Sequence, residues 1–290
     1  MSLFVGSGVA LVTPFHEHGS INFEKLRELV EFHIENGTDA LIICGTTGEV
    51  STLTDEDQIE CIRVAAETAK GRIPVIGGAG SNVTEHAIYL AQGCEKAGAD
   101  GLLIVTPYYN KTTQKGLVEH YTAIAESVNI PIILYNVPSR TGVDIPVSVY
   151  HELSKIPNII GVKEASTDIT KIAKIRALCP IDFTVWSGND DMTVPILSLG
   201  GRGVISVTSN VLPIQVHAMT QAALAGDFDS AAALQLELLP LIAMLFCEVN
   251  PIPVKAAMEI LGYDCGACRM PLTALHPEHK KKLKELLLIE

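Results

Sequence analysis

The chain has 290 residues, with 33 acidic and 21 basic side chains and a formal net charge of −12 at pH 7. Apolar residues make up 48% and charged residues 19%, a balance that supports one large core and excludes a disordered chain or a small disulfide scaffold. The acidic surface argues against nucleic acid and anionic membranes as partners, because both attract positive charge.

The mean hydropathy of +0.30 is high. No apolar run approaches the roughly 18 to 20 residues that cross a bilayer, so we expect no membrane segment. We attribute the excess to strands buried on both faces and to an apolar subunit interface.

The cysteines and the N-terminus indicate a cytoplasmic protein. The seven cysteines are scattered along the chain, as is typical of reduced thiols. The first residues show neither a basic region nor a small-residue cleavage site, so we expect no secretory signal. Cys265 and Cys268 form a single CxxC, which without a second pair is a weak signal for zinc or redox chemistry.

Short apolar runs alternate with longer amphipathic segments. The runs are rich in Val, Ile and Leu and predict buried strands at 9–14, 40–44, 73–78, 101–106, 130–136, 159–164, 183–187 and 203–208. The segments between them predict helices at 23–36, 54–70, 84–97, 115–127, 147–155, 169–177 and 191–199. Because the units repeat regularly, about every 25 to 30 residues, the pattern favours an α/β fold of the (β/α)8 barrel type over a doubly wound sheet. No glycine-rich nucleotide-binding motif follows the first strand.

The end of the chain is helical in pattern, with helices expected at 222–245, 253–261 and 277–288. We therefore predict a barrel over residues 1–225 and a C-terminal helical region over residues 226–290 that packs directly on it. The basic run at 280–284 is best explained as a solvated helix face.

One lysine stands out, because active sites of such barrels lie at the carboxyl ends of the strands. Of the 14 lysines, only Lys163 lies inside a predicted apolar strand. If it points into the barrel, desolvation favours its neutral amine, the nucleophile that Schiff-base chemistry with a carbonyl substrate requires. A buried ion pair between Lys163 and Glu164, or a lysine that reaches past the strand end, explains the same residues.

Other strand ends carry groups that suit anions and protons. In 45–49, two glycines around two threonines bring amides and hydroxyls near a small anion, although an ordinary turn has the same composition. The segments 106–110 and 135–142 hold tyrosines that can shuttle protons or simply cover the barrel. Arg140 suits a carboxylate ligand or a surface ion pair.

A metal site is not expected. Asp190 and Asp191 follow the seventh strand, but no partner ligands stand at the other strand ends, and helix capping explains the pair equally well. No motif for an organic cofactor occurs either.

Together these strand ends resemble the N-acetylneuraminate lyase and dihydrodipicolinate synthase superfamily. The likeness rests on 45–49, 135–142 and 161–166, and it extends through 106–110, 203–208 and 250–255. Arg140 favours the dihydrodipicolinate synthases over the sialic-acid lyases, which lack this arginine. The resemblance implies a Schiff-base aldol condensation of pyruvate with L-aspartate 4-semialdehyde in the diaminopimelate and lysine pathway, without a metal or organic cofactor.

The resemblance also implies a role for each residue. Lys163 would hold pyruvate as an imine and then an enamine, with Tyr135, Thr46 and Tyr109 as a proton relay. The substrate-binding residues would be Thr47 and the Ile205 backbone at the pyruvate carboxylate, Arg140 at the semialdehyde carboxylate, and Gly188.

Assembly and regulation follow from the same resemblance. Tyr109 would cross a two-fold interface in a homotetramer built as a dimer of dimers. A cleft for L-lysine would be lined by Ser51, Asn82, His86 and Tyr108. Because His86 stands where lysine-sensitive members offer a glutamate, we expect weak or absent inhibition by lysine.

Two rival functions remain. A 2-keto sugar acid aldolase or lyase of the same superfamily would keep Lys163 and Tyr135 without needing Arg140. A non-catalytic relative is the other rival, and the intact set of catalytic residues argues against it.

Overall fold

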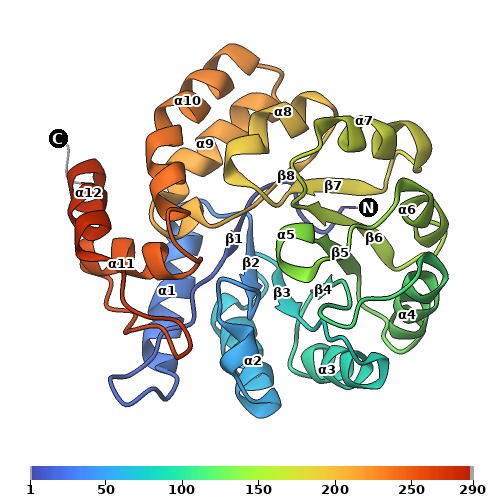
Figure 1. Cartoon of the computed structure of the whole chain (residues 1–290), viewed down its shortest axis with the longest axis horizontal. Coiled ribbons are helices and arrows are strands. Elements are labelled where there is room, and N and C mark those ends of the chain that lie inside the picture. Colours follow the sequence, from blue (N-terminus) through green and yellow to red (C-terminus); the bar gives the residue numbers. More distant parts are fainter. Residues whose placement is uncertain (1, 288–290) are drawn as a thin grey trace.

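The computed structural model describes residues 2–287. Eight parallel strands close into a barrel in chain order, with β1 paired to β8 (Figure 1). The strands are β1 (Gly6–Ala10), β2 (Ala40–Ile43), β3 (Val75–Gly78), β4 (Gly101–Val105), β5 (Ile132–Asn136), β6 (Ile159–Glu164), β7 (Thr184–Ser187) and β8 (Gly203–Ser206). The predicted (β/α)8 barrel is confirmed, and the doubly wound sheet is excluded.

Helices follow every strand and form the outer layer of the barrel, except the short α5, which lies over the strand ends (Figure 1). They are α1 (Phe23–Glu35), α2 (Asp55–Ala69), α3 (Thr84–Lys96), α4 (Gln114–Glu126), α5 (Pro138–Thr141), α6 (Val147–Leu153), α7 (Ile169–Leu178), α8 (Thr193–Ser198) and α9 (Pro213–Leu224). Three short 3-10 turns, η1 (Val50–Thr52), η2 (Asp190–Met192) and η3 (Thr208–Asn210), lie in loops at the carboxyl ends of strands.

Local sequence explains where the main helices begin. The side chain of Asn22 accepts a hydrogen bond from the Lys25 amide at the start of α1, and Thr54 accepts one from the Asp57 amide at the start of α2. Asp168 caps α7 in the same way. Such caps satisfy amides that have no partner inside the helix.

The core has two layers, because side chains alternate along each strand. Inside the barrel, Ile42, Ile133 and Trp186 are buried with other inward residues, and Phe4 stacks on Trp186 with 5.1 Å between ring centroids. The larger layer lies between the outward faces of the strands and the helices. The interior is therefore filled with side chains except at the carboxyl ends of the strands, where polar groups replace apolar ones.

Two elements differ from the prediction. The first strand begins at Gly6 and ends at Ala10 instead of covering 9–14. Gly6 has φ +110°, and a β-carbon there would lie 2.2 Å from Asp39 Oδ2, so only glycine can start this strand. The helix expected over 222–245 is two helices, because Gly226 adopts φ +87° and Asp227 caps the second one.

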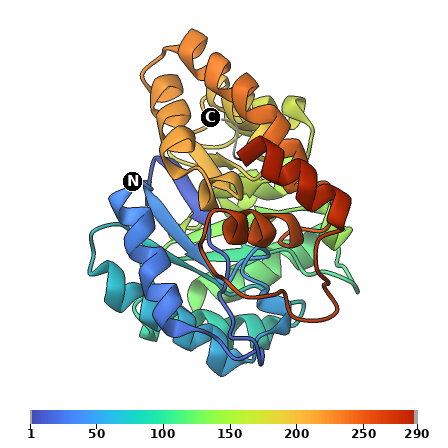
Figure 2. The same cartoon turned by 90° about the vertical axis from the view of Figure 1, so that its left-hand side faces the viewer.

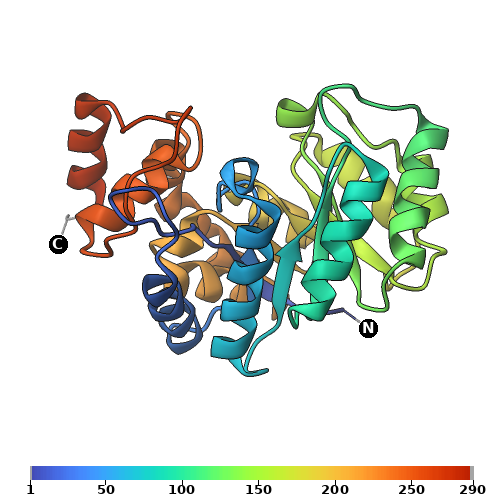
Figure 3. The same cartoon turned by 90° about the horizontal axis from the view of Figure 1, so that it is seen from below.

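The C-terminal helices are α10 (Phe228–Leu245), α11 (Ile252–Ile260) and α12 (Pro277–Leu287). Helix α10 packs against α8, α9 and α12. Figures 1 and 3 place α11 and α12 on the side of the barrel opposite α4, and Figure 2 shows that side face on. Leu288, the last residue of the expected final helix, lies outside the described residues.

Helix α10 also corrects an expectation about apolar segments. Over 18 residues it has a mean hydropathy of 1.5 and is 33% buried in the chain, so by length and composition alone it could cross a membrane. Asp229 and Glu237 interrupt the apolar run in the sequence, which is why the run looks shorter than the helix.

Candidate active site

Lys163 lies inside the barrel. It is 5% exposed, and its Nζ lies 4.5 Å from the centroid of the Tyr135 ring. The two residues are direct register partners on β5 and β6, and Lys163 pairs with Trp186 of β7 on its other side. The interior position that alternation allowed for Lys163 is therefore the one observed.

Glu164 is not the partner of Lys163. It points to the outer face of β6, where it is fully buried and its Oε2 lies 3.4 Å from Lys171 Nζ. The alternative of an ion pair between the neighbours Lys163 and Glu164 is wrong, because consecutive strand residues face opposite sides of the sheet.

The threonine loop, residues 44–49, follows β2 and closes one side of the mouth of the barrel. Thr46 and Tyr135 both line a small cavity of about 40 Å³ at the ends of β2 to β5. The left-handed residues of this loop are Cys44 (φ +56°) and Glu49 (φ +55°) rather than its glycines. Such conformations cost about 1–3 kcal/mol each in residues other than glycine, so surrounding contacts must hold the loop.

A buried ion pair supplies those contacts. Glu49 is completely buried at its side chain, and its Oε1 lies 2.7 Å from Nζ of Lys255 in α11. The Arg269 amide donates to Glu49 Oε2 at 2.8 Å. Lys255 Nζ and the Arg269 guanidinium both lie over the Phe15 ring, 4.1 and 4.4 Å from its centroid. The C-terminal region thus holds the end of the threonine loop.

Asn250 connects two of the expected substrate-binding residues. Its Nδ2 donates to Thr47 Oγ1 at 3.0 Å, and its carbonyl accepts a hydrogen bond from Arg140 Nη2 at 3.4 Å. Thr47 is 2% exposed, whereas Arg140 is exposed on the short helix α5. Asn250 therefore forms hydrogen bonds both with the buried Thr47 hydroxyl and with the exposed Arg140 guanidinium.

Ile205 and Gly188 also lie at the expected end of the barrel. Ile205 is buried among the inward side chains. Gly188 donates its amide to the Glu164 carbonyl, and a β-carbon there would lie 2.6 Å from the Ala165 Cβ. Only glycine lets β7 approach the end of β6 this closely.

A larger cavity of about 440 Å³ opens beside this centre. Its walls are the ends of β5, β6 and β7 and one face of α10, with lining residues that include Ser139, Ser166, Asn189 and Phe246. This volume suits a small organic ligand.

Tyr109 is not part of the cluster within this chain. It is 90% exposed, it does not line the small cavity, and it adopts φ +69° in the loop between β4 and α4. Of the four expected relay and imine residues, one chain therefore brings together Lys163, Tyr135 and Thr46.

The residues of the expected effector cleft form two contacts. Asn82 Nδ2 donates to the Tyr108 carbonyl at 3.2 Å. His86 Nε2 lies 3.0 Å from both carboxylate oxygens of Asp55. Ser51 is exposed on η1. The argument that this cleft lacks a carboxylate is therefore incomplete, because Asp55 places one directly beside His86.

Groups that could bind a metal have other uses in the described chain. Asp190 is buried and accepts hydrogen bonds from the Val207 and Thr208 amides at 3.0 and 3.1 Å. Burial raises the pKa of Cys265 and of Cys268 to about 11, which disfavours the thiolate that zinc or redox chemistry needs.

One further group has metal-ligand composition. The ligand atoms of Cys247, Glu248 and His279 lie within 4.8 Å of one another. Glu248 Oε1 is already engaged by His279 Nδ1 at 2.6 Å, so a hydrogen bond accounts for this contact between α12 and the end of α10.

The sequence interpretation missed the groups that hold the site. Asn250 and Lys255 were noted only as part of the resemblance, Asn136 only as a member of the strand end 135–142, and Lys171 was not noted at all. The available signal was that Asn136 follows Tyr135 and Glu164 follows Lys163, because alternation places these polar side chains on the outer face of the sheet. No such signal marks Lys171.

The comparisons agree with this geometry. Residues 3–289 match the model of the dihydrodipicolinate synthetase family. A curated relative from Thermoanaerobacter sp. (strain X514), named 4-hydroxy-tetrahydrodipicolinate synthase, is 55% identical over 288 residues, covering 99% of this chain and 97% of the relative.

Solved structures show the same likeness. A dihydrodipicolinate synthase from Cyanidioschyzon merolae with lysine bound has a TM-score of 0.97 and 38% identity, covering 99% of this chain and 98% of that one. The chloride-inhibited enzyme from Acinetobacter baumannii complexed with pyruvate has a TM-score of 0.96 and 42% identity, covering 98% and 97%. The chain therefore belongs to the dihydrodipicolinate synthetase family.

Proposed function

We propose that this protein is a 4-hydroxy-tetrahydrodipicolinate synthase, a cytoplasmic lyase that condenses pyruvate with L-aspartate 4-semialdehyde through a Schiff base on Lys163. The observation that carries the proposal is the buried Lys163 amine beside the Tyr135 ring at the mouth of the barrel. The name of the Thermoanaerobacter relative and the pyruvate in the Acinetobacter complex support it. The seven free cysteines support the cytoplasmic location.

The chemistry follows from the groups present. The Lys163 amine attacks the ketone carbon of pyruvate, and loss of water gives an imine. Its positive nitrogen draws electrons from the methyl group, so removal of one methyl proton gives an enamine whose carbon attacks the aldehyde. The aldehyde oxygen takes up a proton and the imine forms again. Attack of the semialdehyde's own amino group on the imine carbon then displaces the Lys163 amine and releases the product. Tyr135 lies where it can carry these protons, with Thr46 next to it at the small cavity.

Two groups of residues would bind the carboxylates of the two substrates. Thr47, fixed by Asn250, and the backbone at Ile205 bind the pyruvate carboxylate. Gly188 leaves room for substrate beside the end of β6, and Arg140, exposed on α5, binds the carboxylate of the semialdehyde at the mouth of the barrel. A sugar-acid lyase would have no use for a guanidinium at this point, which favours the synthase over that rival.

The first prediction concerns the nucleophile. Borohydride reduction with pyruvate should trap a covalent adduct on Lys163, because it is the lysine inside the barrel, and Lys163→Ala should abolish trapping and most of the rate. Peptide mass mapping locates the adduct. Lys174→Ala, on the outer helix α7, is the matched control and should trap normally. An adduct on another lysine would contradict the mechanism.

The second prediction concerns Arg140 as the clamp for the carboxylate of aspartate semialdehyde. Arg140→Ala should lower turnover with aspartate semialdehyde while leaving pyruvate trapping intact, because Arg140 lies outside the buried centre. One charged contact is worth about 1.5–3 kcal/mol, roughly ten- to a hundredfold. Steady-state kinetics and trapping on the same sample measure both effects. Equal loss of trapping would place Arg140 in the inner site.

We also propose a homotetramer built as a dimer of dimers. Two groups of exposed apolar side chains support it. One lies around α3 and the β4–α4 loop and includes Val83, Tyr89, Tyr108 and Tyr109. The other lies on the outer side of α7, α8 and α10 and includes Ile169, Ile181, Leu199 and Leu236. Large exposed apolar groups of this kind mark subunit contacts.

The third prediction tests whether Tyr109 completes the relay of a partner. Tyr109→Phe should lower kcat by about a hundredfold, the low end of proton-transfer catalysis. If Tyr109 acts across the interface, mixing Tyr109→Phe with Lys163→Ala after subunit exchange should restore activity, because each mixed dimer holds one complete site. No recovery in mixtures that sedimentation shows to contain mixed dimers would show that Tyr109 does not act in the partner's site, and an unchanged kcat of Tyr109→Phe would place it outside the relay.

The fourth prediction concerns the effector cleft of Ser51, Asn82, His86 and Tyr108. We expect weak inhibition by L-lysine, because Asp55 is engaged by His86 and is not free for an ammonium group. His86→Glu would place two carboxylates together and should lower the half-inhibiting lysine concentration about tenfold. His86→Gln is the control. Strong inhibition of the unchanged chain would contradict this expectation.

A further inference from the structure

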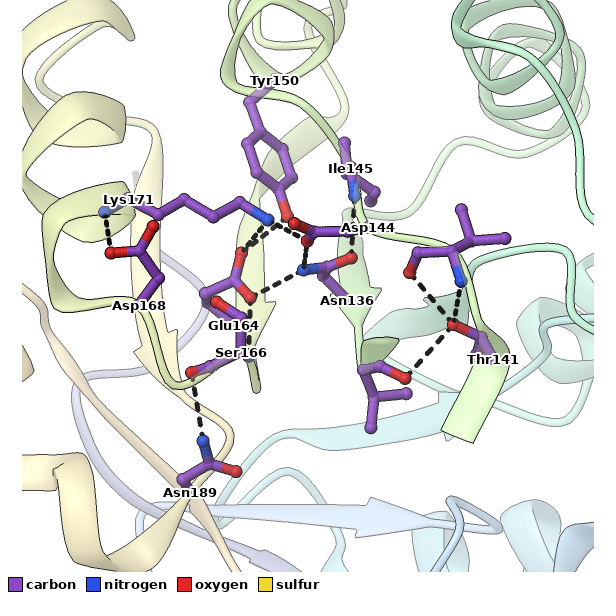
Figure 4. Close-up of polar contacts among 12 residues, drawn as sticks. Asn136, Thr141, Asp144, Ile145, Tyr150, Glu164, Ser166, Asp168, Lys171 and Asn189 are labelled. Atoms are coloured by element: carbon purple, nitrogen blue, oxygen red, sulfur yellow. Dashed lines mark hydrogen bonds and ion pairs between the residues drawn. The ribbon is translucent and has the colours of Figure 1, made fainter. Parts of the chain in front are cut away.

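A polar network lies on the outer face of β5 and β6, directly behind the catalytic pair (Figure 4). Asn136 and Glu164 are register partners, one residue after Tyr135 and Lys163. Asn136 Nδ2 donates to Glu164 Oε1 at 2.7 Å. Glu164 also accepts hydrogen bonds from the Tyr150 hydroxyl at 2.8 Å and from the Ser166 amide at 2.9 Å.

The same network closes the loop that carries Arg140. This loop leaves β5 after Asn136 and returns to its side chain, where Asn136 Oδ1 accepts from the Ile145 amide at 3.0 Å. Asn136 Nδ2 also donates to Asp144 Oδ1 at 2.8 Å. The loop that carries Arg140 therefore starts at Asn136, next to Tyr135, and is hydrogen-bonded to the side chain of the same residue where it returns.

Lys171 is the cation of this network. Its side chain is 7% exposed, it bonds to Asp144, and its Nζ lies 3.4 Å from Glu164 Oε2. A fully buried Glu164 carboxylate is costly without a positive partner. Lys171 thus connects the strand of Lys163 to the loop of Arg140, although it belongs to α7 and reaches β6 from outside the barrel.

We propose that Lys171 is a positioning residue for the condensation. By holding Glu164 and Asp144 together, it fixes the distance between the Lys163 centre and the Arg140 clamp, and so it sets the affinity for the second, carboxylate-bearing substrate. Pyruvate binds inside the barrel and does not depend on this distance. The inference rests on the proposed function and adds a residue that acts through others.

Asp144→Asn tests the contact without leaving a buried charge unpaired, because this carboxylate is 57% exposed and its loss leaves Glu164 paired with Lys171. Asp144 also lines the larger cavity and Lys171 does not, so the Lys171 variants below decide between positioning and direct contact with substrate. We expect KM for aspartate semialdehyde to rise about tenfold, while KM for pyruvate and borohydride trapping stay within about twofold of the unchanged chain. Glu31→Gln is the matched control. It removes one carboxylate from another ion pair between a helix and a loop, with Arg72 at 2.7 Å, and should change nothing.

Lys171→Met should have the same selective effect, larger in size, and Lys171→Arg should restore the KM of the unchanged chain because it keeps the charge. The double variant Asp144→Asn with Lys171→Met should be no worse than Lys171→Met alone, since residues that act as one unit are not additive.

Two results would overturn the inference: an unchanged semialdehyde KM in Asp144→Asn, or a parallel loss of pyruvate trapping, which would indicate general damage to the fold. Failure of the unchanged chain to trap pyruvate would overturn the proposed function, and this inference with it.

Discussion

The cross-strand pairing of β5 with β6 is the constraint on which the site depends. It places Tyr135 beside Lys163 on the inner face and Asn136 beside Glu164 on the outer face. The inner pair suits the proposed imine chemistry because it is shielded from bulk water. The outer pair is stable because each of its buried side-chain oxygens has a hydrogen-bond partner. A shift of one residue in either strand would exchange the faces, so the hydrogen bond from Asn136 to Glu164 also protects the inner geometry.

The other side of the mouth depends on the C-terminal region. The threonine loop contains the left-handed residues Cys44 and Glu49, and the contact between Glu49 and Lys255 offsets that strain. Asn250, from the same region, reaches both Thr47 and Arg140. Helix α10 adds one wall of the larger cavity. The helices after the barrel therefore belong to the site, although none of their side chains is assigned a chemical step.

Much of the candidate site could be predicted because it follows from local rules. A lysine inside an apolar strand, and polar residues at the strand ends, are visible without coordinates. The supporting groups could not be found in this way. Lys171 looks like an ordinary helix lysine, because its contact with Glu164 joins two elements that the sequence does not show to be in contact. The resemblance placed Asp55 and His86 in one cleft, but only the structure showed that they are bonded to each other. The alternative of an ion pair between Lys163 and Glu164 was wrong because neighbouring residues on a strand point to opposite faces of the sheet.

The sequence by itself determined the order of strands and helices, the barrel class and which lysine lies inside an apolar strand, because alternation, helix caps and apolar runs act over a few residues. Only the tertiary structure decided which buried charges pair and that Tyr109 remains exposed within one chain. These outcomes depend on which surfaces meet when the barrel closes. A buried charge is costly without an opposite charge close to it, so the pairs that form are those that folding brings together, whatever their separation in the sequence.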